Sequence, residues 1–204
     1  RLAGYYLAEG GTDRGYYLTF SFGAHETNYI REVKQLLKKS FGIEKVYENK
    51  HKTNHGISIV VSSALLARVF DQMFGKGTSN KSIPKWMLEE SPEKQKELII
   101  GLFRGDGNYY NKKTSSRGWL KEIFRISTTS LEMAKQSRDI LLRLGVAAFI
   151  NARDRKKEGR KTMYTIGITG EYLNQFGRIV GIRTKIQLNK KKRATMFHLD
   201  KNYL

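Results

Sequence analysis

The chain has 204 residues, of which 39% are hydrophobic, and this is enough for one medium domain or two small ones that share a core. Its net charge of +19 favours a polyanionic partner, and nucleic acid before a membrane, because we find neither a strongly amphipathic basic helix nor an apolar run of transmembrane length. Cysteine is absent, which excludes disulfides and thiolate metal sites, and with no secretory signal pattern we expect an intracellular protein, in the cytoplasm or nucleoid or in an organelle.

The chain begins with an apolar helix in which small residues lie four positions apart. Residues 2–10 read LAGYYLAEG, so Gly4 and Ala8 share one helical face and leave room for a second helix to approach closely. Glu9 ends this helix, and Gly10 suits a left-handed stop. A carboxylate at a helix C-terminus faces the negative end of the helix dipole, and a bound cation would offset that conflict.

Strands and helices alternate through the rest of the first half. The patterns predict, in chain order, a short strand between turns within 10–15, a strand over 16–23, a helix over 26–41, strands over 44–50 and 57–62, and a helix over 64–74. The apolar face of the first long strand contains Tyr16, Leu18, Phe20 and Phe22. Gly42 is expected to end the helix predicted over residues 26–41.

The second half repeats this order after a linker over residues 75–97. Residues 99–107 read IIGLFRGDG, in which Gly101, Gly105 and Asp106 correspond to Gly4, Ala8 and Glu9. The following segments predict a polar loop over 108–117, a strand over 119–128, a helix over 131–144, strands over 148–155 and 163–169, and a helix over 171–180. We therefore expect an α+β protein in which two similar sheets form a concave, basic saddle.

The two motif copies have a chemical consequence if their helices pack on each other. Glu9 and Asp106 would then lie side by side at one end of the helix pair. Two such carboxylates repel each other unless a proton or a metal lies between them. This arrangement suits metal-dependent hydrolysis of phosphodiesters.

The doubled motif resembles that of the LAGLIDADG homing endonucleases in their single-chain, two-motif form. The resemblance covers nearly the whole chain and implies two pseudo-symmetric αββαββα repeats with the motif helices packed between them. It divides the chain into a first repeat over 1–74, a linker over 75–97, a second repeat over 98–182 and a basic C-terminal segment over 183–204. It implies a monomeric enzyme that hydrolyses both strands of double-stranded DNA at a long asymmetric site and leaves short 3′ overhangs. Mobile introns and inteins are the usual hosts.

The resemblance also implies roles for individual residues. Glu9 and Asp106 would bind divalent metal, with the backbone carbonyls of Ala8 and Gly105 as further ligands, and Mg²⁺ is expected because hard cations prefer oxygen ligands. Many members place a lysine near the metals. Lys81 and Lys185 are the candidates here, and the alternative for both is an ordinary phosphate contact or a solvated lysine.

Outward-facing residues of the predicted strands are candidates for DNA contacts, because paired strands fit the major groove. About half of them would touch phosphate alone. They are Tyr17, Thr19, Ser21, Lys45, Tyr47, Asn49, Lys121, Arg125, Ser127, Asn151, Arg153 and Arg155. The basic run over 190–193 is expected to be a solvated tail.

Two other functions fit the same scaffold. One is an RNA maturase that helps an intron to splice, with intron RNA as its partner. The other is a non-catalytic DNA-binding regulator with degenerate motifs. Both motif acids are present, which argues against the regulator but not against the maturase.

Overall fold

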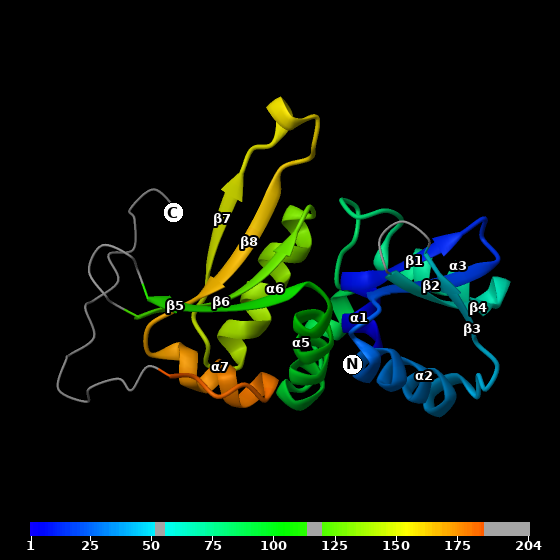
Figure 1. The fold of residues 1–204 in the computed structure, drawn as a ribbon, viewed down its shortest axis with the longest axis horizontal. Coiled ribbons are helices and arrows are strands. Elements are labelled where there is room, and N and C mark those ends of the chain that lie inside the picture. The colour runs from blue at the N-terminus through cyan, green and yellow to red at the C-terminus, as the bar shows by residue number, and fades with distance from the viewer. Residues whose placement is uncertain (52–55, 114–119, 186–204) are drawn as a thin grey trace.

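The computed structural model describes residues 1–51, 56–113 and 120–185, and it contains two four-stranded sheets on either side of a central helix pair (Figure 1). The elements are α1 (Leu2–Glu9), β1 (Gly10–Asp13), β2 (Tyr17–Gly23), α2 (Thr27–Phe41), β3 (Tyr47–Lys50), β4 (Gly56–Ser62), α3 (Ala64–Phe74), α4 (Lys85–Leu88), α5 (Pro92–Asp106), β5 (Gly107–Lys113), β6 (Leu120–Thr128), α6 (Leu131–Arg143), β7 (Phe149–Arg153), the short 3₁₀ turn η1 (Lys156–Glu158), β8 (Met163–Ile168) and α7 (Tyr172–Val180).

The two sheets have the same topology and matching register. Their strand orders are β1-β2-β4-β3 and β5-β6-β8-β7, and every pairing is antiparallel. Gly10 pairs with Phe20 in the first sheet, and Gly107 pairs with Ile126 in the second. The expected α+β fold with two repeats is therefore confirmed, and the paired positions at the centre of one sheet have counterparts in the other.

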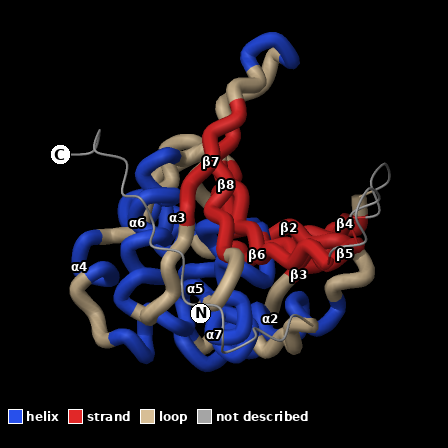
Figure 2. The backbone as a smooth tube through the Cα atoms, turned by 90° about the vertical axis from the view of Figure 1, so that its left-hand side faces the viewer, coloured by secondary structure: helices blue, strands red, loops and turns tan. Residues whose placement is uncertain are grey.

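The apolar alternation predicted from the sequence places one face of each sheet against helices. Leu18 and Phe20 of β2 are fully buried, as are Phe124 and Ile126 of β6. In Figure 2 the helices gather on one side of the strands, so the opposite face of the sheets carries the polar residues of the alternation. That uncovered face is the one available to a large ligand.

The helices α1 and α5 form the centre of the molecule. Gly4 and Gly101 lie at their crossing, where a Cβ on Gly4 would be 2.1 Å from the Leu98 carbonyl oxygen. Tyr6 points away from the crossing into the first repeat, where its ring packs 4.8 Å from Phe70. The small motif residues therefore face the partner helix, as the sequence predicts, and the bulky Tyr5 and Tyr6 are buried in the core.

The prediction that Gly10 and Gly107 end the motif helices in the left-handed conformation is wrong. Gly10 has φ −82° and ψ 159°, and Gly107 has φ −87° and ψ 149°, so both are extended and begin strands. Glycine is needed at both positions because the backbone of the preceding helical turn lies too close to leave room for a side chain. A Cβ on Gly10 would lie 2.6 Å from the Tyr6 carbonyl oxygen, and one on Gly107 would lie 2.1 Å from that of Phe103.

Three further expectations differ from the structure. Residues 107–113 form β5 instead of a polar loop, because Tyr109 stacks on Phe124 at 4.5 Å and ties the segment to β6. Tyr16 precedes β2 and is 58% exposed, since the buried alternation starts at Leu18. The strand expected over 44–50 begins only at Tyr47. The predictions for 114–119 and for the basic run over 190–193 fall outside the described residues.

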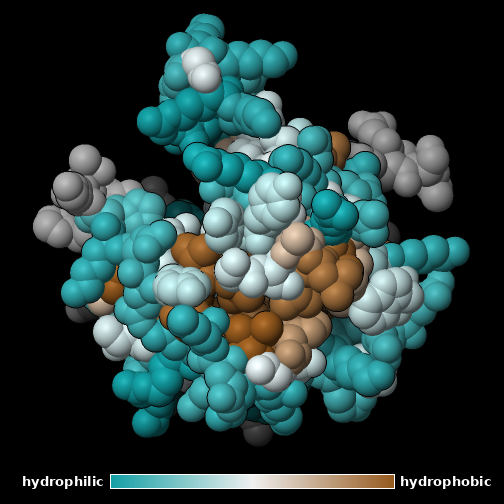
Figure 3. Space-filling model, turned by 90° about the vertical axis from the view of Figure 1, so that its right-hand side faces the viewer, coloured by the Kyte–Doolittle hydropathy of each residue, from teal (hydrophilic) through white to brown (hydrophobic). Residues whose placement is uncertain are grey.

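The surface of the molecule has two prominent features. The β7–β8 hairpin, with η1 at its tip, projects beyond the body in both ribbon views (Figures 1 and 2). On the side of the first repeat, an apolar area is visible among hydrophilic side chains (Figure 3), and Leu65 and Phe41 of that repeat are 72% and 43% exposed. Within the described residues, no helix has the length and apolarity needed to cross a bilayer.

Candidate metal and DNA-binding site

Glu9 and Asp106 are the last residues of α1 and α5, and the packing of these helices brings their ends together. A Cβ on Gly105 would lie 2.4 Å from the Ala8 Cβ and 3.0 Å from the Glu9 Cγ, so the close approach continues up to the acids. Burial and the charge of Glu9 raise the pKa of Asp106 to about 7. Burial and the charge of Glu26 raise the pKa of Glu9. Ionising both acids therefore costs free energy, which a nearby cation would offset.

The donor set at this point fits a hard divalent cation. It consists of the carboxylates of Glu9 and Asp106 together with the backbone of Ala8 and Gly105, which are both half-buried. Mg²⁺ commonly binds through one or two carboxylates and keeps several water molecules. The described residues contain no cluster of three or more metal-ligating His, Asp or Glu side chains, so water or phosphate would supply the other ligands.

A pocket of about 300 Å³ opens beside Asp106. It lies between the two repeats and would admit part of a phosphodiester backbone. Its lining comprises Leu7, Ala8, Thr78, Lys81, Asp106, Ser127, Thr128, Thr129 and Met163.

Lys81 is buried against the end of α1, with only 4% of its surface exposed. Its Nζ donates to the carbonyl oxygens of Tyr6 at 2.7 Å, Leu7 at 3.1 Å and Gly10 at 2.7 Å. Burial lowers the pKa of Lys81 to about 8, although the charges of Asp106 and Glu9 oppose this shift. An ammonium group has three hydrogens, and carbonyls at the C-terminus of α1 accept all three.

Lys185 has a different environment from Lys81. Its side chain is exposed, and its backbone N–H donates to the Glu122 Oε1 at 2.7 Å. Glu122 is buried at 4% exposure and also accepts a hydrogen bond from the Tyr109 hydroxyl. The two candidate lysines are therefore not equivalent, and Lys81 is the one whose charge acts on both acids.

The uncovered face of the first sheet carries the candidates from the first repeat. Tyr17, Thr19, Tyr47 and Asn49 line a depression of about 500 Å³, together with Asp13, His51, Ser58 and Val60. Ser21 lies at the edge of this group, with its Oγ 3.0 Å from the Ser58 Oγ. Lys45 precedes β3, and its Nζ lies 5.5 Å from the centre of the Tyr47 ring. His51 and Ser58 were missed by the sequence analysis, and they are joined by a 2.7 Å hydrogen bond.

The second sheet places its candidates in cross-strand rows. Ser127 and Asn151 both pair with Thr165, and Arg125 is held 5.5 Å from the centre of the Tyr110 ring. Lys121 is exposed on β6. Arg153 and Arg155 lie toward the hairpin tip, where both form ion pairs with Glu158 at 2.9 and 3.0 Å. Both arginines are therefore paired with a carboxylate in this structure.

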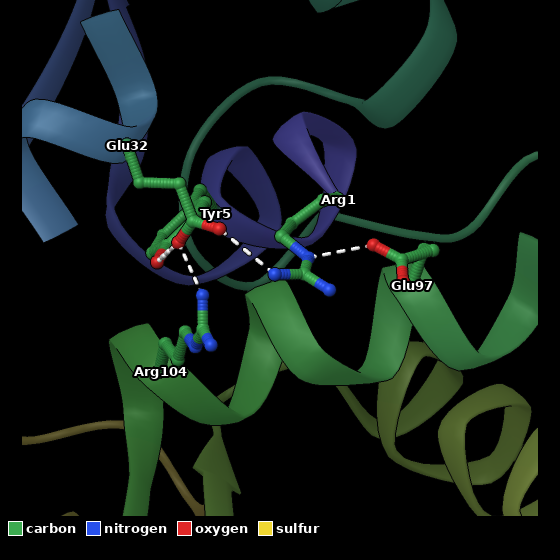
Figure 4. A network of polar contacts seen from close by, with 5 residues as sticks. All are labelled: Arg1, Tyr5, Glu32, Glu97 and Arg104. Atoms are coloured by element: carbon green, nitrogen blue, oxygen red, sulfur yellow. Dashed lines mark hydrogen bonds and ion pairs between the residues drawn. The ribbon is translucent and has the colours of Figure 1, made fainter. Parts of the chain in front are cut away.

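A polar network on the other side of the helix pair was not foreseen from the sequence (Figure 4). Glu32 of α2 accepts hydrogen bonds from Tyr5, Arg1 and Arg104, and the Arg1 Nε also lies 2.7 Å from Glu97. Burial opposes ionisation of Glu32, but these hydrogen bonds outweigh it and lower its pKa. Since α2 belongs to the first repeat and Arg104 to the second, the network ties the repeats together.

Comparison with known proteins agrees with this architecture. Residues 93–181 match the LAGLIDADG-like domain family. The crystal structure of I-DmoI in complex with DNA and Mn superposes with a TM-score of 0.61 at 18% identity, covering 90% of this chain and 96% of that one. The chain has the two-repeat LAGLIDADG fold. The resemblance inferred from the paired motifs is thereby confirmed.

Further matches include one more solved structure and two curated proteins. The N-terminal LAGLIDADG domain of DUF199/WhiA superposes with a TM-score of 0.57 at 15% identity, covering 91% of this chain and 81% of that domain. Among curated proteins, the uncharacterized protein MJ1054 of Methanocaldococcus jannaschii is 32% identical over 89% of this chain and 20% of its own length. The DNA helicase Hel308 of Thermococcus kodakarensis is 27% identical over 84% of this chain and 15% of its own length. The chain thus spans a fifth or less of these curated relatives.

Proposed function

We propose that this LAGLIDADG protein is a site-specific endonuclease that hydrolyses both strands of double-stranded DNA with a divalent metal and leaves short 3′ overhangs. The main supporting observation is that two half-buried acids, Glu9 and Asp106, lie at the ends of the paired motif helices and have raised pKa values. The likeness to I-DmoI, whose complexes with DNA contain Mn or Ca, supports the proposal. Mg²⁺ is the metal that we expect.

The chain's own residues have distinct tasks in this function. Glu9 and Asp106, with the carbonyls of Ala8 and Gly105, would hold the metal, which when bound polarises phosphoryl oxygens and lowers the pKa of water. Lys81 acts through the protein, because it anchors the carbonyls at the end of α1 from which Glu9 projects. We therefore assign Lys81 to positioning and Lys185 to neither task.

The two sheets would bind the DNA on either side of the acids. One copy contains both acids and both sheets, so we propose that a monomer suffices. Equivalent positions differ in chemistry, as with Thr19 in the first sheet and Arg125 in the second. The target is therefore expected to be asymmetric, and the partial span of the curated relatives fits an endonuclease carried within a longer intracellular host protein, such as an intein.

The test is cleavage of a randomised double-stranded DNA library in Mg²⁺ and in EDTA. The variants are Glu9→Gln and Asp106→Asn, and the matched control is Asp139→Asn, which removes an exposed acid of α6. Metal-dependent cuts at one recurrent sequence are expected for the native chain and the control, and no cuts for either motif variant. Cutting that survives loss of either acid would contradict the assignment.

A second candidate is a DNA-binding protein that does not cut. The likeness to the N-terminal LAGLIDADG domain of DUF199/WhiA supports it, because that domain shares the fold. Sequence-selective retention of DNA without cuts in Mg²⁺, Mn²⁺ or Ca²⁺ would establish this function instead. The intron RNA maturase stays a prediction, because none of the contacts described above favours RNA over DNA.

A further inference from the structure

Phe149 is an apolar side chain on the uncovered face of the second sheet. It is 48% exposed, while its neighbour Ile150 on β7 packs toward the core. Phe149 pairs with Gly167 of β8, and Gly167 pairs on its other side with Arg125 of β6. The three residues therefore form one cross-strand row, on the face that also carries Asn151.

The ring of Phe149 has a fixed seat in this row. A Cβ on Gly167 would lie 2.3 Å from the Phe149 Cζ and 2.7 Å from its Cε2, so the ring lies over the glycine. Any larger residue at position 167 would displace the ring. An exposed aromatic group that is held in place in this way presents a defined apolar surface to a ligand.

The first sheet has an aromatic side chain at the matching position. Val60 pairs with Thr19 and with Tyr47, in the same register in which Gly167 pairs with Arg125 and with Phe149. Tyr47 is 49% exposed, almost the same fraction as Phe149. The two differ in that Tyr47 carries a hydroxyl group, while Phe149 has no group that can form a conventional hydrogen bond.

We propose that Phe149 determines specificity by packing on the 5-methyl group of a thymine in the major groove. The inference rests on the proposed binding of DNA to the sheets. The major groove admits a two-stranded ribbon, and thymine alone among the four bases presents a methyl group there. Arg125 in the same row can donate hydrogen bonds to a neighbouring base. Phe149 beside it would discriminate bases by the presence or absence of a methyl group instead.

The experiment is selection of bound duplexes from a randomised library in Ca²⁺, so that it does not depend on cutting. The native chain is compared with Phe149→Ser and with Leu142→Ser, which removes an exposed leucine of α6 as a control. We expect one thymine position in the second-repeat half of the selected site to lose its preference in Phe149→Ser alone. Replacing that thymine by deoxyuridine should weaken binding of the native chain about four-fold, as expected for one buried methyl group, and leave Phe149→Ser unchanged.

Gly167→Ala provides a second route, because it displaces the ring and leaves Phe149 in the chain. It should lose the same thymine preference, with circular dichroism and thermal unfolding used to show that both variants remain folded. An unchanged thymine preference in Phe149→Ser, or equal sensitivity to deoxyuridine in both proteins, would overturn this inference alone. Absence of any selected sequence for the native chain would overturn the proposed sequence-specific binding as well.

Discussion

Gly4 and Gly101 touch across the axis of the molecule: a Cβ on Gly101 would lie 3.1 Å from the Gly4 Cα and 2.2 Å from the Arg1 carbonyl oxygen. Both contacts are to backbone, which cannot move aside as a side chain can. The spacing between the motif helices, and hence between Glu9 and Asp106, therefore depends on the absence of these two side chains.

Gly101→Ala should lower the free energy of unfolding by about 3 kcal/mol, because the added methyl group forces α1 and α5 apart. Gly11→Ala is the control, since its Cβ would meet no atom closer than the Thr19 Oγ1 at 3.5 Å. Urea titration of both variants measures the difference. Equal stability of Gly101→Ala and the native chain would mean that the helices do not pack as described.

Lys81→Met should destabilise the protein by about 2 kcal/mol, because it leaves three carbonyls at the end of α1 without their donor. Methionine keeps most of the apolar stem, so the loss reports mainly on the ammonium group. The exposed Lys76 offers a matched control in Lys76→Met. If Lys81 instead acts only on the reaction, Lys81→Met would unfold at the same urea concentration as the native chain, and only its cutting rate would fall.

Asp106 should make the stability of the metal-free protein depend on pH. Its pKa is raised from 3.8 to about 7 in the folded state, so the folded chain keeps a proton that the unfolded chain releases. The contribution of protonated Asp106 to the free energy of unfolding is complete below about pH 4 and is lost as the pH rises to about 7. In EDTA, the native chain should lose stability relative to Asp106→Asn across this window, by at most about 4 kcal/mol.

Chemical unfolding at several pH values gives this difference, and Asp139→Asn shows the effect of removing an exposed carboxylate. Mg²⁺ at pH 8 should stabilise the native chain and leave Asp106→Asn nearly unchanged. Parallel stability curves for the native chain and Asp106→Asn would show that Asp106 does not carry the raised pKa.

Arg104 and Glu32 should be energetically coupled across the repeat interface. Arg104 pairs with Glu32 and also lies 5.8 Å from the centre of the Tyr29 ring (Figure 4 shows the ion pair). A double-mutant cycle with Arg104→Ala and Glu32→Ala should give a coupling energy of about 1–2 kcal/mol. The same cycle on Lys38 and Glu44, an exposed pair, should give about 0.5 kcal/mol or less.

The tip of the β7–β8 hairpin should add sequence-independent affinity for DNA. Within the described residues, Glu158 pairs with Arg153 and Arg155, and the remaining cations of the tip form no ion pair. Those remaining cations are Lys156, Lys157, Arg160 and Lys161. Each phosphate contact contributes about 0.9 to the slope of log affinity against log salt, so changing all four to glutamine should reduce the slope by about 2 to 4.

The matched control removes four exposed cations from the helices. It changes Lys39, Arg68, Lys96 and Lys135 to glutamine. Fluorescence anisotropy on duplex DNA at a series of salt concentrations measures both variants. An equal fall in slope for the two would mean that overall charge, and not the hairpin, attracts the DNA.

The sequence by itself determined the two-repeat organisation and the main faces of its elements. The doubled motif located Glu9 and Asp106 at helix ends, and period-two alternation predicted that Thr19 and Arg125 would face away from the core. These features are local, because alternation and helical spacing record which side of an element meets the core. The same local rule failed at residues 108–113, where a polar segment became a strand because Tyr109 stacks on Phe124.

Only the tertiary structure decided which distant segments meet. Lys81 and Lys185 both lie in basic loops. Lys81 is buried and donates a hydrogen bond to Tyr6, which is 75 residues away in the sequence, while Lys185 is exposed. The raised pKa of Asp106, the seat of Phe149 on Gly167 and the tie between Glu32 and Arg104 likewise arise from contacts across elements. Local patterns do not encode such contacts, because burial and electrostatic coupling depend on which surfaces the folded chain brings together.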